Sequence, residues 1–430
     1  MRALNVRCPQ VFELKVIFVP IGSAGDVHPF VAVALALRQR GHDVSVITSP
    51  YFSELFDDLK IPFVPFGTVE QYEAITHHPG LWHPLHGFRV VSEAMGMGTP
   101  ELFSLVNREI DKGGDIVVSG ALAFGARIAQ EKNNFPLVTM HLQPTAFWSI
   151  KDSPIFHPWL SSINRFPDSV KQLILTLADR VSDRALTRTI NPFRKTLGLR
   201  PVRHIVSQWW HSPIRTIGLF PSWFAPPQSD WPPNATLTGF PLYDEQNIFR
   251  SSAKFGPLLN DIDAENDPPI VFAPGSGNRQ AHRFFKAAVD ACKKLDRRAL
   301  LLTRYREQLP LPLPKGVHHI DYIPFSKVLP LAAALVHHGG VGTAAQALAA
   351  GCPQLVMPMT FDQPDNAHRL AKLGVARILK PSQFRGKAVA STLSELLASA
   401  AVSRQCQTVS RRFEGVNPIE TTCELIEAAK

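Results

Sequence analysis

The sequence predicts an α/β protein with two Rossmann-like domains that face each other across a cleft. The first observation is length, because 430 residues with an apolar fraction of 45% exceed one ordinary hydrophobic core. The second is a strand–turn–helix–strand pattern at residues 14–48, and the third is the restart of this pattern at residue 269. Ligands of such folds bind where the carboxyl ends of the strands meet the cleft.

The first half begins with an apolar run, residues 14–21, of the kind that forms a strand buried on both faces. A glycine-containing turn follows, and we expect a helix at 29–40 and a second strand at 44–48. The pattern continues with a strand, a helix and a strand, at 115–119, 123–132 and 137–141. Residues 166–203 are expected to be helical, with recurring arginines at Arg180, Arg184, Arg188 and Arg194.

The second half repeats the pattern with strands, helices and glycine turns. Its expected elements are strands at 269–273, 299–303, 334–337 and 354–358, and helices at 279–295 and 341–350. We therefore divide the chain into a first domain at 14–245, a linker at 246–268 and a second domain at 269–410. Residues 411–430 are expected to form a C-terminal helix that packs back on the first domain.

Composition limits the partners and the compartment. The net charge of +9 suits anionic partners, although the charge is spread out and no nucleic-acid-binding motif accompanies it. The five cysteines include no Cys-x-x-Cys pair, which favours a reducing compartment. No signal peptide and no run of about 18 apolar residues is recognisable. We expect a cytoplasmic protein, at most peripheral on the inner face of the cell membrane, where the arginines of 180–194 would meet anionic lipid.

The strongest motif is His-Gly-Gly-Val-Gly-Thr at residues 338–343, where a strand ends and a helix begins. Free backbone N–H groups and the positive end of the helix dipole would face an anion there. We expect phosphate contacts from the backbone of Gly340 and Gly342, the Thr343 hydroxyl and the His338 ring. A purely structural strand–helix turn is the alternative.

Other polar groups follow neighbouring strands of the second domain. Asp362 and Gln363 come after the strand that follows the glycine-rich loop, and they suit the recognition of sugar hydroxyls. Gly275 and Ser276 form another turn that can face a phosphate. Tyr322 and Ile323 precede a helix, and the Tyr322 ring can stack on a base.

Asp26 is the candidate catalytic group of the first domain. A carboxylate at the tip of the first strand would face the cleft and take a proton from a hydroxyl. A cap at the start of the helix that contains Pro29 is an equally good interpretation from spacing alone.

The order of these motifs resembles the inverting family 1 glycosyltransferases, which have two Rossmann-like domains in the GT-B arrangement. The resemblance implies that residues 338–343 hold the diphosphate of a nucleotide-sugar, that Asp362 and Gln363 bind the sugar, and that Asp26 is the base. In plant members a second aspartate orients a catalytic histidine, whereas the matching strand end here is Ser119-Gly120. Outside the donor motif, residues 22–30, 125–129 and 220–228 resemble bacterial rhamnosyltransferases of rhamnolipid synthesis.

The function expected from this resemblance is inverting transfer of a rhamnosyl or glucosyl group from a dTDP- or UDP-sugar to an apolar, lipid-like hydroxyl. His28, His141 and Trp148 are the expected acceptor-binding residues. Neither a cofactor nor a metal is expected, because the loop N–H groups, the helix dipole and His338 would stabilise the charge on the departing diphosphate. Asp261 and Asp263 resemble a metal-binding Asp-x-Asp but fall in the linker. The rival functions are a nucleotide-sugar 2-epimerase and a non-catalytic nucleotide-sugar-binding subunit.

Overall fold

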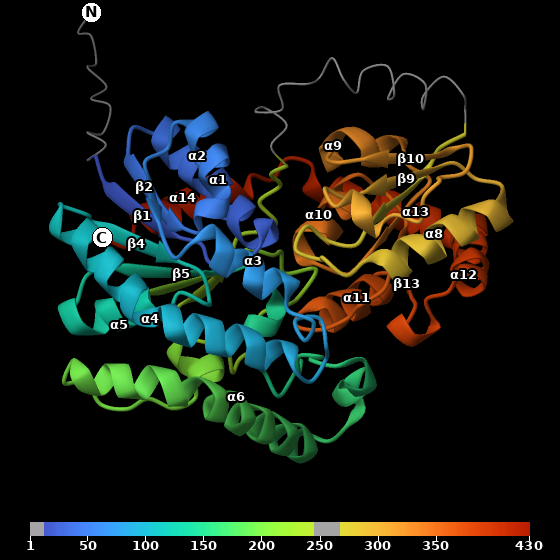
Figure 1. Ribbon diagram of the computed structural model, residues 1–430. Helices are drawn as coiled ribbons and strands as arrows, with labels where there is room; N and C mark the ends of the chain where they lie inside the picture. Colours follow the sequence, from blue (N-terminus) through green and yellow to red (C-terminus); the bar gives the residue numbers. More distant parts are fainter. Residues whose placement is uncertain (1–12, 245–266) are drawn as a thin grey trace, which may run out of the picture.

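The computed structural model describes residues 13–244 and 267–430, and these form two parallel sheets with helices on both faces (Figure 1). The first sheet has the strand order β3-β2-β1-β4-β5-β6-β7, and the second has the order β10-β9-β8-β11-β12-β13. Each sheet reverses its strand order beside its first strand, which is where such folds bind ligands. The linker expected at 246–268, with Asp261 and Asp263, lies outside the described residues except for its last two positions.

The first sheet consists of β1 (Lys15–Val19), β2 (Asp43–Thr48), β3 (Phe63–Pro65), β4 (Ile116–Ser119), β5 (Leu137–His141), β6 (Arg215–Gly218) and β7 (Ala235–Leu237). Its helices are α1 (Ala24–Gln39), α2 (Ser53–Leu59), α3 (Val69–His77), α4 (Gly87–Asp111), α5 (Phe124–Asn133) and α6 (Asp168–Thr196). All neighbouring strands run parallel, and β1, β4 and β5 are almost entirely buried. This burial explains their continuous apolar runs.

The second sheet consists of β8 (Ile270–Ala273), β9 (Ala299–Leu302), β10 (Val317–Ile320), β11 (Ala334–His337), β12 (Gln354–Val356) and β13 (Ala376–Ile378). Its helices are α8 (His282–Leu295), α9 (Phe325–Val328), α10 (Val341–Ala349), α11 (Gln363–Lys372), α12 (Gly386–Ala398) and α13 (Ala400–Ser410). The chain ends with α14 (Pro418–Glu427). No helix in the two described ranges is both long and apolar enough to cross a membrane.

The start of α1 differs from the sequence-based prediction, because the helix begins at Ala24 rather than at Pro29. Ser23 is the N-cap, and it forms a capping box with Asp26. Asp26 therefore lies in the first turn of a helix and not at the tip of β1. Pro29 is accommodated inside the helix near its start. The sequence suggests the later start because proline is common in the first turn of a helix, and because glycines such as Gly25 are common in loops.

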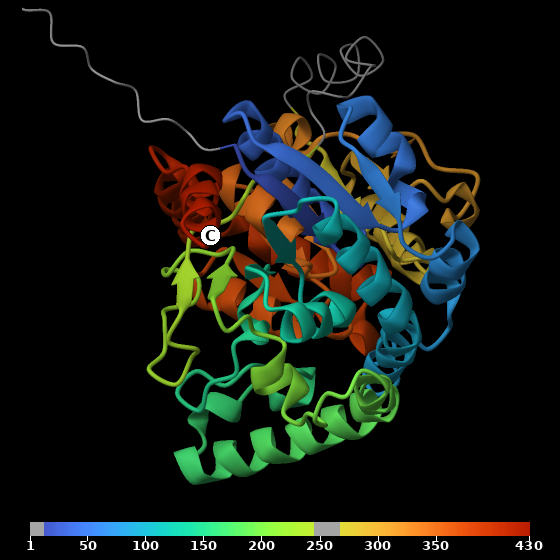
Figure 2. The same cartoon turned by 90° about the vertical axis from the view of Figure 1, so that its left-hand side faces the viewer.

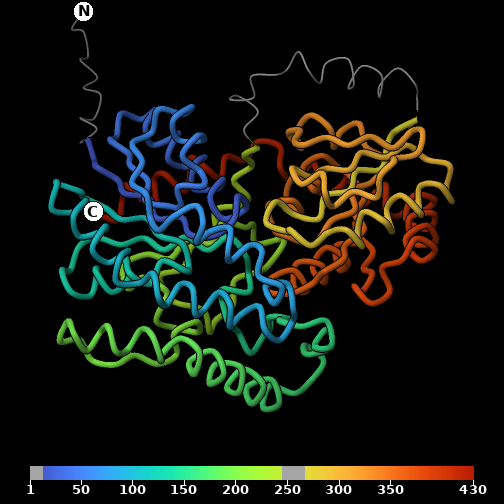
Figure 3. The backbone as a smooth tube through the Cα atoms, viewed as in Figure 1, coloured from blue at the N-terminus to red at the C-terminus, as the bar shows by residue number. Residues whose placement is uncertain are grey.

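The C-terminal helix α14 packs against α1 of the first domain, and Figure 3 lets the chain be followed back across the molecule. Cys423 and Ile426 of α14 belong to the same buried cluster as Val33 and Leu37 of α1. Glu427 accepts hydrogen bonds from Arg40 at 2.6 Å and lies 2.8 Å from the ring of His42. The last helix thus buttresses the helix that carries Asp26.

Gly125 of α5 permits the close approach of α4, because it has no side chain at the contact. A Cβ at this position would lie 2.6 Å from the Phe103 nitrogen and 2.7 Å from the Thr99 oxygen, and neither backbone atom can rotate away. We expect Gly125→Ala to lower the free energy of unfolding by about 1–3 kcal/mol, measured by urea denaturation. Gly342→Ala is the matched control, since a Cβ there meets no atom within 4 Å. Equal losses in both variants would contradict the packing explanation.

Candidate active site

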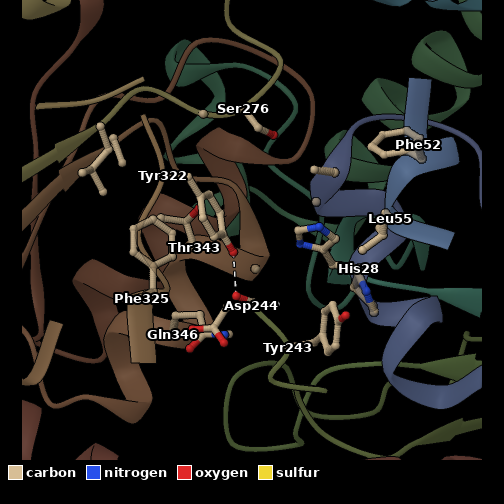
Figure 4. Close-up of a pocket in the computed structure, with 18 of the residues that line it drawn as sticks. His28, Phe52, Leu55, Tyr243, Asp244, Ser276, Tyr322, Phe325, Thr343 and Gln346 are labelled. Atoms are coloured by element: carbon tan, nitrogen blue, oxygen red, sulfur yellow. Dashed lines mark hydrogen bonds between the residues drawn. The ribbon is translucent and has the colours of Figure 1, made fainter. Parts of the chain in front are cut away.

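A cavity of about 350 Å³ lies between the two domains (Figure 4). Seven of the site residues expected from the sequence line it: His28, Gly275, Ser276, Tyr322, Ile323, Gly342 and Thr343. The lining does not include the other seven, Asp26, His141, Trp148, His338, Gly340, Asp362 and Gln363. The structure thus brings together the start of α1, the turn after β8 and the N-terminus of α10.

The N-terminus of α10 is open toward this cavity. Gly340 is the N-cap and offers no side chain to the first turn, so the helix's initial N–H groups are free of a side-chain cap. Gly342 and Thr343, both in that turn, line the cavity. The helix dipole and these N–H groups make the position suitable for an anion such as a phosphate.

His338 lies behind this lining, between two glycines. Cβ atoms added at Gly275 and Gly340 would lie 2.9 and 2.5 Å from its Nε2, so only glycine permits this packing. Burial lowers the pKa of His338 to about 4, against a hydrogen bond to Ala273 that favours the charged form. Its buried Nδ1 has no partner among the described residues. A neutral imidazole is therefore held beside the phosphate-type site with one ring nitrogen available.

Asp362 and Gln363 begin α11, with Asp362 as the N-cap. The Gln363 Oε1 accepts hydrogen bonds from the backbone of Met359 and Thr360, so its carbonyl is already used to fix the turn. Asp362 accepts a hydrogen bond from Asn366, whose amide also donates to the Gly339 oxygen at 2.9 Å. Asn366 thus joins α11 to the glycine-rich loop, a role that the sequence does not reveal because an asparagine near a helix start is also a common cap.

Asp26 is held by Ser23, whose backbone N–H and hydroxyl donate to Oδ2 at 2.7 and 3.0 Å. The hydrogen bonds of Asp26 to described residues all use Oδ2, which leaves Oδ1 for another donor. Burial raises the pKa of Asp26, and the two hydrogen bonds from Ser23 oppose this rise. The structure therefore confirms the capping interpretation, while the role of Asp26 as a base stays a prediction.

The carboxyl groups of Asp26 and Asp362 interact across the domain boundary. Burial is the largest cause that raises the pKa of Asp362 to about 7, and the charge of Asp26 raises it further. The residues come from different domains and are 336 positions apart in the chain (362 − 26). A carboxyl group whose pKa is raised by burial and by a second carboxylate is typical of a catalytic site.

Tyr322 lies on the second-domain side of the cavity, next to α9 (Figure 4). Its hydroxyl donates to the backbone oxygen of Asp244 at 2.6 Å, and the guanidinium of Arg304 lies 5.5 Å from the ring centre. Asp244 in turn accepts from the backbone N–H of Ser326 at 2.7 Å. These contacts fix the position of the Tyr322 ring in the cavity wall.

An aromatic group that sequence reasoning missed connects the two domains beside the cavity. Tyr51 stacks on Tyr72 with ring centres 4.3 Å apart, and its hydroxyl lies 3.4 Å from that of Tyr305. The guanidinium of Arg279 lies 3.6 Å from the centre of the Tyr305 ring. No sequence motif marks these residues, because the contact joins chain segments about 250 residues apart (Tyr51 to Tyr305).

The three expected acceptor residues occupy different surroundings. His28 lines the cavity and packs edge-on against Tyr243. His141 is buried, and its Nε2 is hydrogen-bonded to His211 at 2.9 Å. Trp148 packs against Phe156 outside the cavity lining. The expectation of a direct acceptor contact thus finds support in position only for His28, since His141 already belongs to a buried, hydrogen-bonded pair.

Comparisons with known proteins agree with this architecture. Residues 16–147 match the glycosyltransferase family 28 N-terminal domain, and residues 287–426 match the C-terminal domain of erythromycin biosynthesis protein CIII-like proteins. The O-mycaminosyltylonolide 6-deoxyallosyltransferase of Streptomyces fradiae is 27% identical, over 96% of this chain and 97% of its own length. A sterol 3-beta-glucosyltransferase of Arabidopsis thaliana is 25% identical, over 84% of this chain and 57% of that protein.

The fold also matches that of a solved enzyme. The spinosyn rhamnosyltransferase SpnG complexed with thymidine diphosphate superposes with a TM-score of 0.67, at 16% identity, over 96% of this chain and all of that one. Two facing Rossmann-like domains with a shared cavity define the GT-B fold, so the expected fold class is confirmed. The chain is a glycosyltransferase that combines a family 28-type N-terminal domain with a CIII-like C-terminal domain.

Gly342 gives a test of the α10 site. An added methyl group has open space, and alanine favours a helix over glycine, so we expect Gly342→Ala to raise stability by about 0.5–1 kcal/mol. The same methyl group would occupy the cavity that Gly342 lines, and it should weaken nucleoside diphosphate binding. Thermal melts with and without dTDP and UDP measure both effects. An unchanged nucleotide-induced shift in melting temperature would show that α10 is not the binding site.

Proposed function

We propose that the protein is an inverting glycosyltransferase that moves a rhamnosyl or glucosyl group from a dTDP- or UDP-sugar to a hydroxyl of an apolar acceptor. The observation that carries this proposal is the open N-terminus of α10, which faces a cavity lined by both domains, with the start of α1, the helix of Asp26, in the wall of the same cavity. Residues of both domains line this cavity, which suits a reaction between two substrates held by different domains.

In the proposed reaction, the donor's diphosphate binds at the N-terminus of α10. The N–H groups of Gly342 and Thr343 and the dipole of α10 stabilise the charge that develops on the departing diphosphate. The neutral imidazole of His338 donates or accepts a hydrogen bond through its available nitrogen. The proposal gives no role to a metal ion or a cofactor.

The base and the ribose would lie toward Tyr322, on the second-domain side. Tyr322 and Phe325 offer aromatic faces, and the Gln346 side chain lies one helical turn beyond Gly342 in the same wall (Figure 4). Sequence reasoning missed Gln346 because an amide inside a helix has no motif of its own. The structure of a fold relative with thymidine diphosphate supports a dTDP-sugar as one candidate donor.

The acceptor hydroxyl would approach from the first domain. Apolar side chains of that domain line the cavity on the His28 side, among them Phe52 and Leu55 (Figure 4). One relative is a sterol 3-beta-glucosyltransferase, which supports an apolar alcohol as the acceptor here. Oδ1 of Asp26 would remove the hydroxyl proton as the oxygen attacks the anomeric carbon from the face opposite the diphosphate, so the configuration inverts.

Asp26→Asn tests the assignment of the base. The amide oxygen can still accept from Ser23, so α1 should remain capped, but the side chain can no longer take a proton. We expect kcat/KM to fall by about 10²- to 10⁴-fold while the affinity for dTDP or UDP stays nearly unchanged. Normal turnover by the Asn variant would refute the assignment. Turnover of the nucleotide-sugar without any acceptor would instead support a 2-epimerase.

Ser23→Ala tests the same carboxylate through pH. The reactive form is ionised, so activity is lost as the pH falls through the pKa of Asp26, which burial raises. Removing the Ser23 hydroxyl deletes one hydrogen bond that lowers this pKa. We therefore expect the acid limb of kcat/KM to move to higher pH, while the plateau at high pH is retained. A uniform loss of activity with an unmoved acid limb would contradict this role.

A further inference from the structure

Helix α6 carries an exposed row of apolar side chains that no core covers. The row, here called the α6 stripe, consists of Val170, Leu173, Leu177 and Val181, with exposed fractions of 38%, 60%, 50% and 68%. Spacings of three and four residues place all four on one face of the helix. The opposite face contributes the buried side chains Leu175, Leu186 and Ile190. Helix α6 therefore has one apolar face that packs in the protein and a second apolar face that is exposed.

Two aromatic residues extend this surface just before the helix. Trp159 is 67% exposed and Phe166 is 49% exposed. Together with the α6 stripe they make six of the fourteen exposed large apolar residues among the described positions, within only 23 residues of chain (159–181). Such gathering, unlike scattered exposure, marks an interaction surface.

The charges around the α6 stripe are one-sided. Exposed Arg184 and Arg188 continue the same face toward the C-terminus, and exposed Arg180 lies beside it. The acidic residues of the helix are engaged elsewhere: Asp168 pairs with Lys151 and Lys171, Asp179 pairs with His204, and Asp183 accepts from the backbone of His204 and Ile205. The surface offered outward is therefore apolar and cationic.

We propose that the α6 stripe docks the protein on an anionic lipid surface, with the helix lying in the plane of the interface. An amphipathic helix with apolar, aromatic and arginine residues on its free face is suited to this position, because the apolar side chains enter the acyl region while the guanidinium groups meet lipid phosphates. Helix α6 runs along one edge of the molecule in both views (Figures 1 and 2).

The experiment compares vesicle binding by the full chain and by paired variants. Vesicles contain phosphatidylcholine alone or phosphatidylcholine mixed with phosphatidylglycerol, and no sugar substrate is present. The apolar variant carries Leu173→Gln, Leu177→Gln and Val181→Gln, and the charge variant carries Arg184→Gln and Arg188→Gln. We expect the unmodified chain to cosediment with the mixed vesicles, the apolar variant to lose on the order of tenfold in affinity, and the charge variant about thirtyfold.

Two controls match these changes. The apolar control, Met97→Gln with Val416→Gln, alters exposed apolar residues outside the α6 stripe. The charge control, Lys293→Gln with Lys294→Gln on α8, removes two positive charges, as many as the charge variant does. Both controls should bind vesicles as the unmodified chain does, and circular dichroism should show all variants folded. Equal losses in a variant and its control would overturn the proposal.

Other outcomes also overturn it. One is that the unmodified chain does not bind the mixed vesicles. Another is that light scattering shows a dimer for the unmodified chain and a monomer for the apolar variant, because the α6 stripe would then be a contact between two copies. Sugar transfer to a detergent-dispersed acceptor is measured in parallel. This activity should persist in every variant, so failure of lipid docking and failure of the proposed transfer can be told apart.

Discussion

The site depends on the close packing of one imidazole against two glycine backbones. Gly275 follows the first strand of the second sheet and Gly340 caps α10, and His338 fills the space between them. Any side chain at either glycine would push the two loops apart. Asn366 of α11 supports the same arrangement, because its side-chain amide donates a hydrogen bond to the Gly339 oxygen. The result is a rigid wall in which the N-terminus of α10 is presented to the cavity without a side-chain cap.

The second constraint is the junction between the domains. Val341, the first residue of α10, packs against the buried clusters of both domains, so the phosphate-type site sits where the two cores meet. Helix α14 fixes α1 from behind through Glu427, Arg40 and His42. The position of Asp26 therefore follows from contacts made by both ends of the chain. A change in α14 would reach the carboxylate through α1 and not through any contact with a substrate.

The sequence allowed the prediction of two parallel sheets, their central strands and the α10 loop, because buried parallel strands and glycine turns leave local signals. The outer strands β3, β6, β7, β10 and β13 were not predicted. The sequence misplaced Asp26 at a strand tip because Pro29 suggested a later helix start. It could not show that the side-chain carbonyl of Gln363 accepts a hydrogen bond from the backbone of its own turn, nor that Tyr51 contacts Tyr305, because both facts depend on the folded chain. The α6 stripe was missed for another reason. Its leucines and valines have the spacing of a core face, and only exposure distinguishes a second apolar face from the first.

The two carboxyl groups at the domain boundary gain different roles from their surroundings. Asp26 is buried but receives two hydrogen bonds from Ser23 that favour its ionised form, whereas Asp362 has a pKa raised to about 7. A pKa near 7 leaves Asp362 protonated for part of the time at neutral pH, so in the proposed reaction it would donate to a sugar hydroxyl, while Asp26 would accept the proton of the attacking hydroxyl. The charge of Asp26 raises the cost of ionising Asp362, so bringing the domains together favours the protonated form of Asp362 when Asp26 is charged. In the proposed reaction the charged group would remove the proton of the acceptor hydroxyl, and the protonated one would bind the sugar.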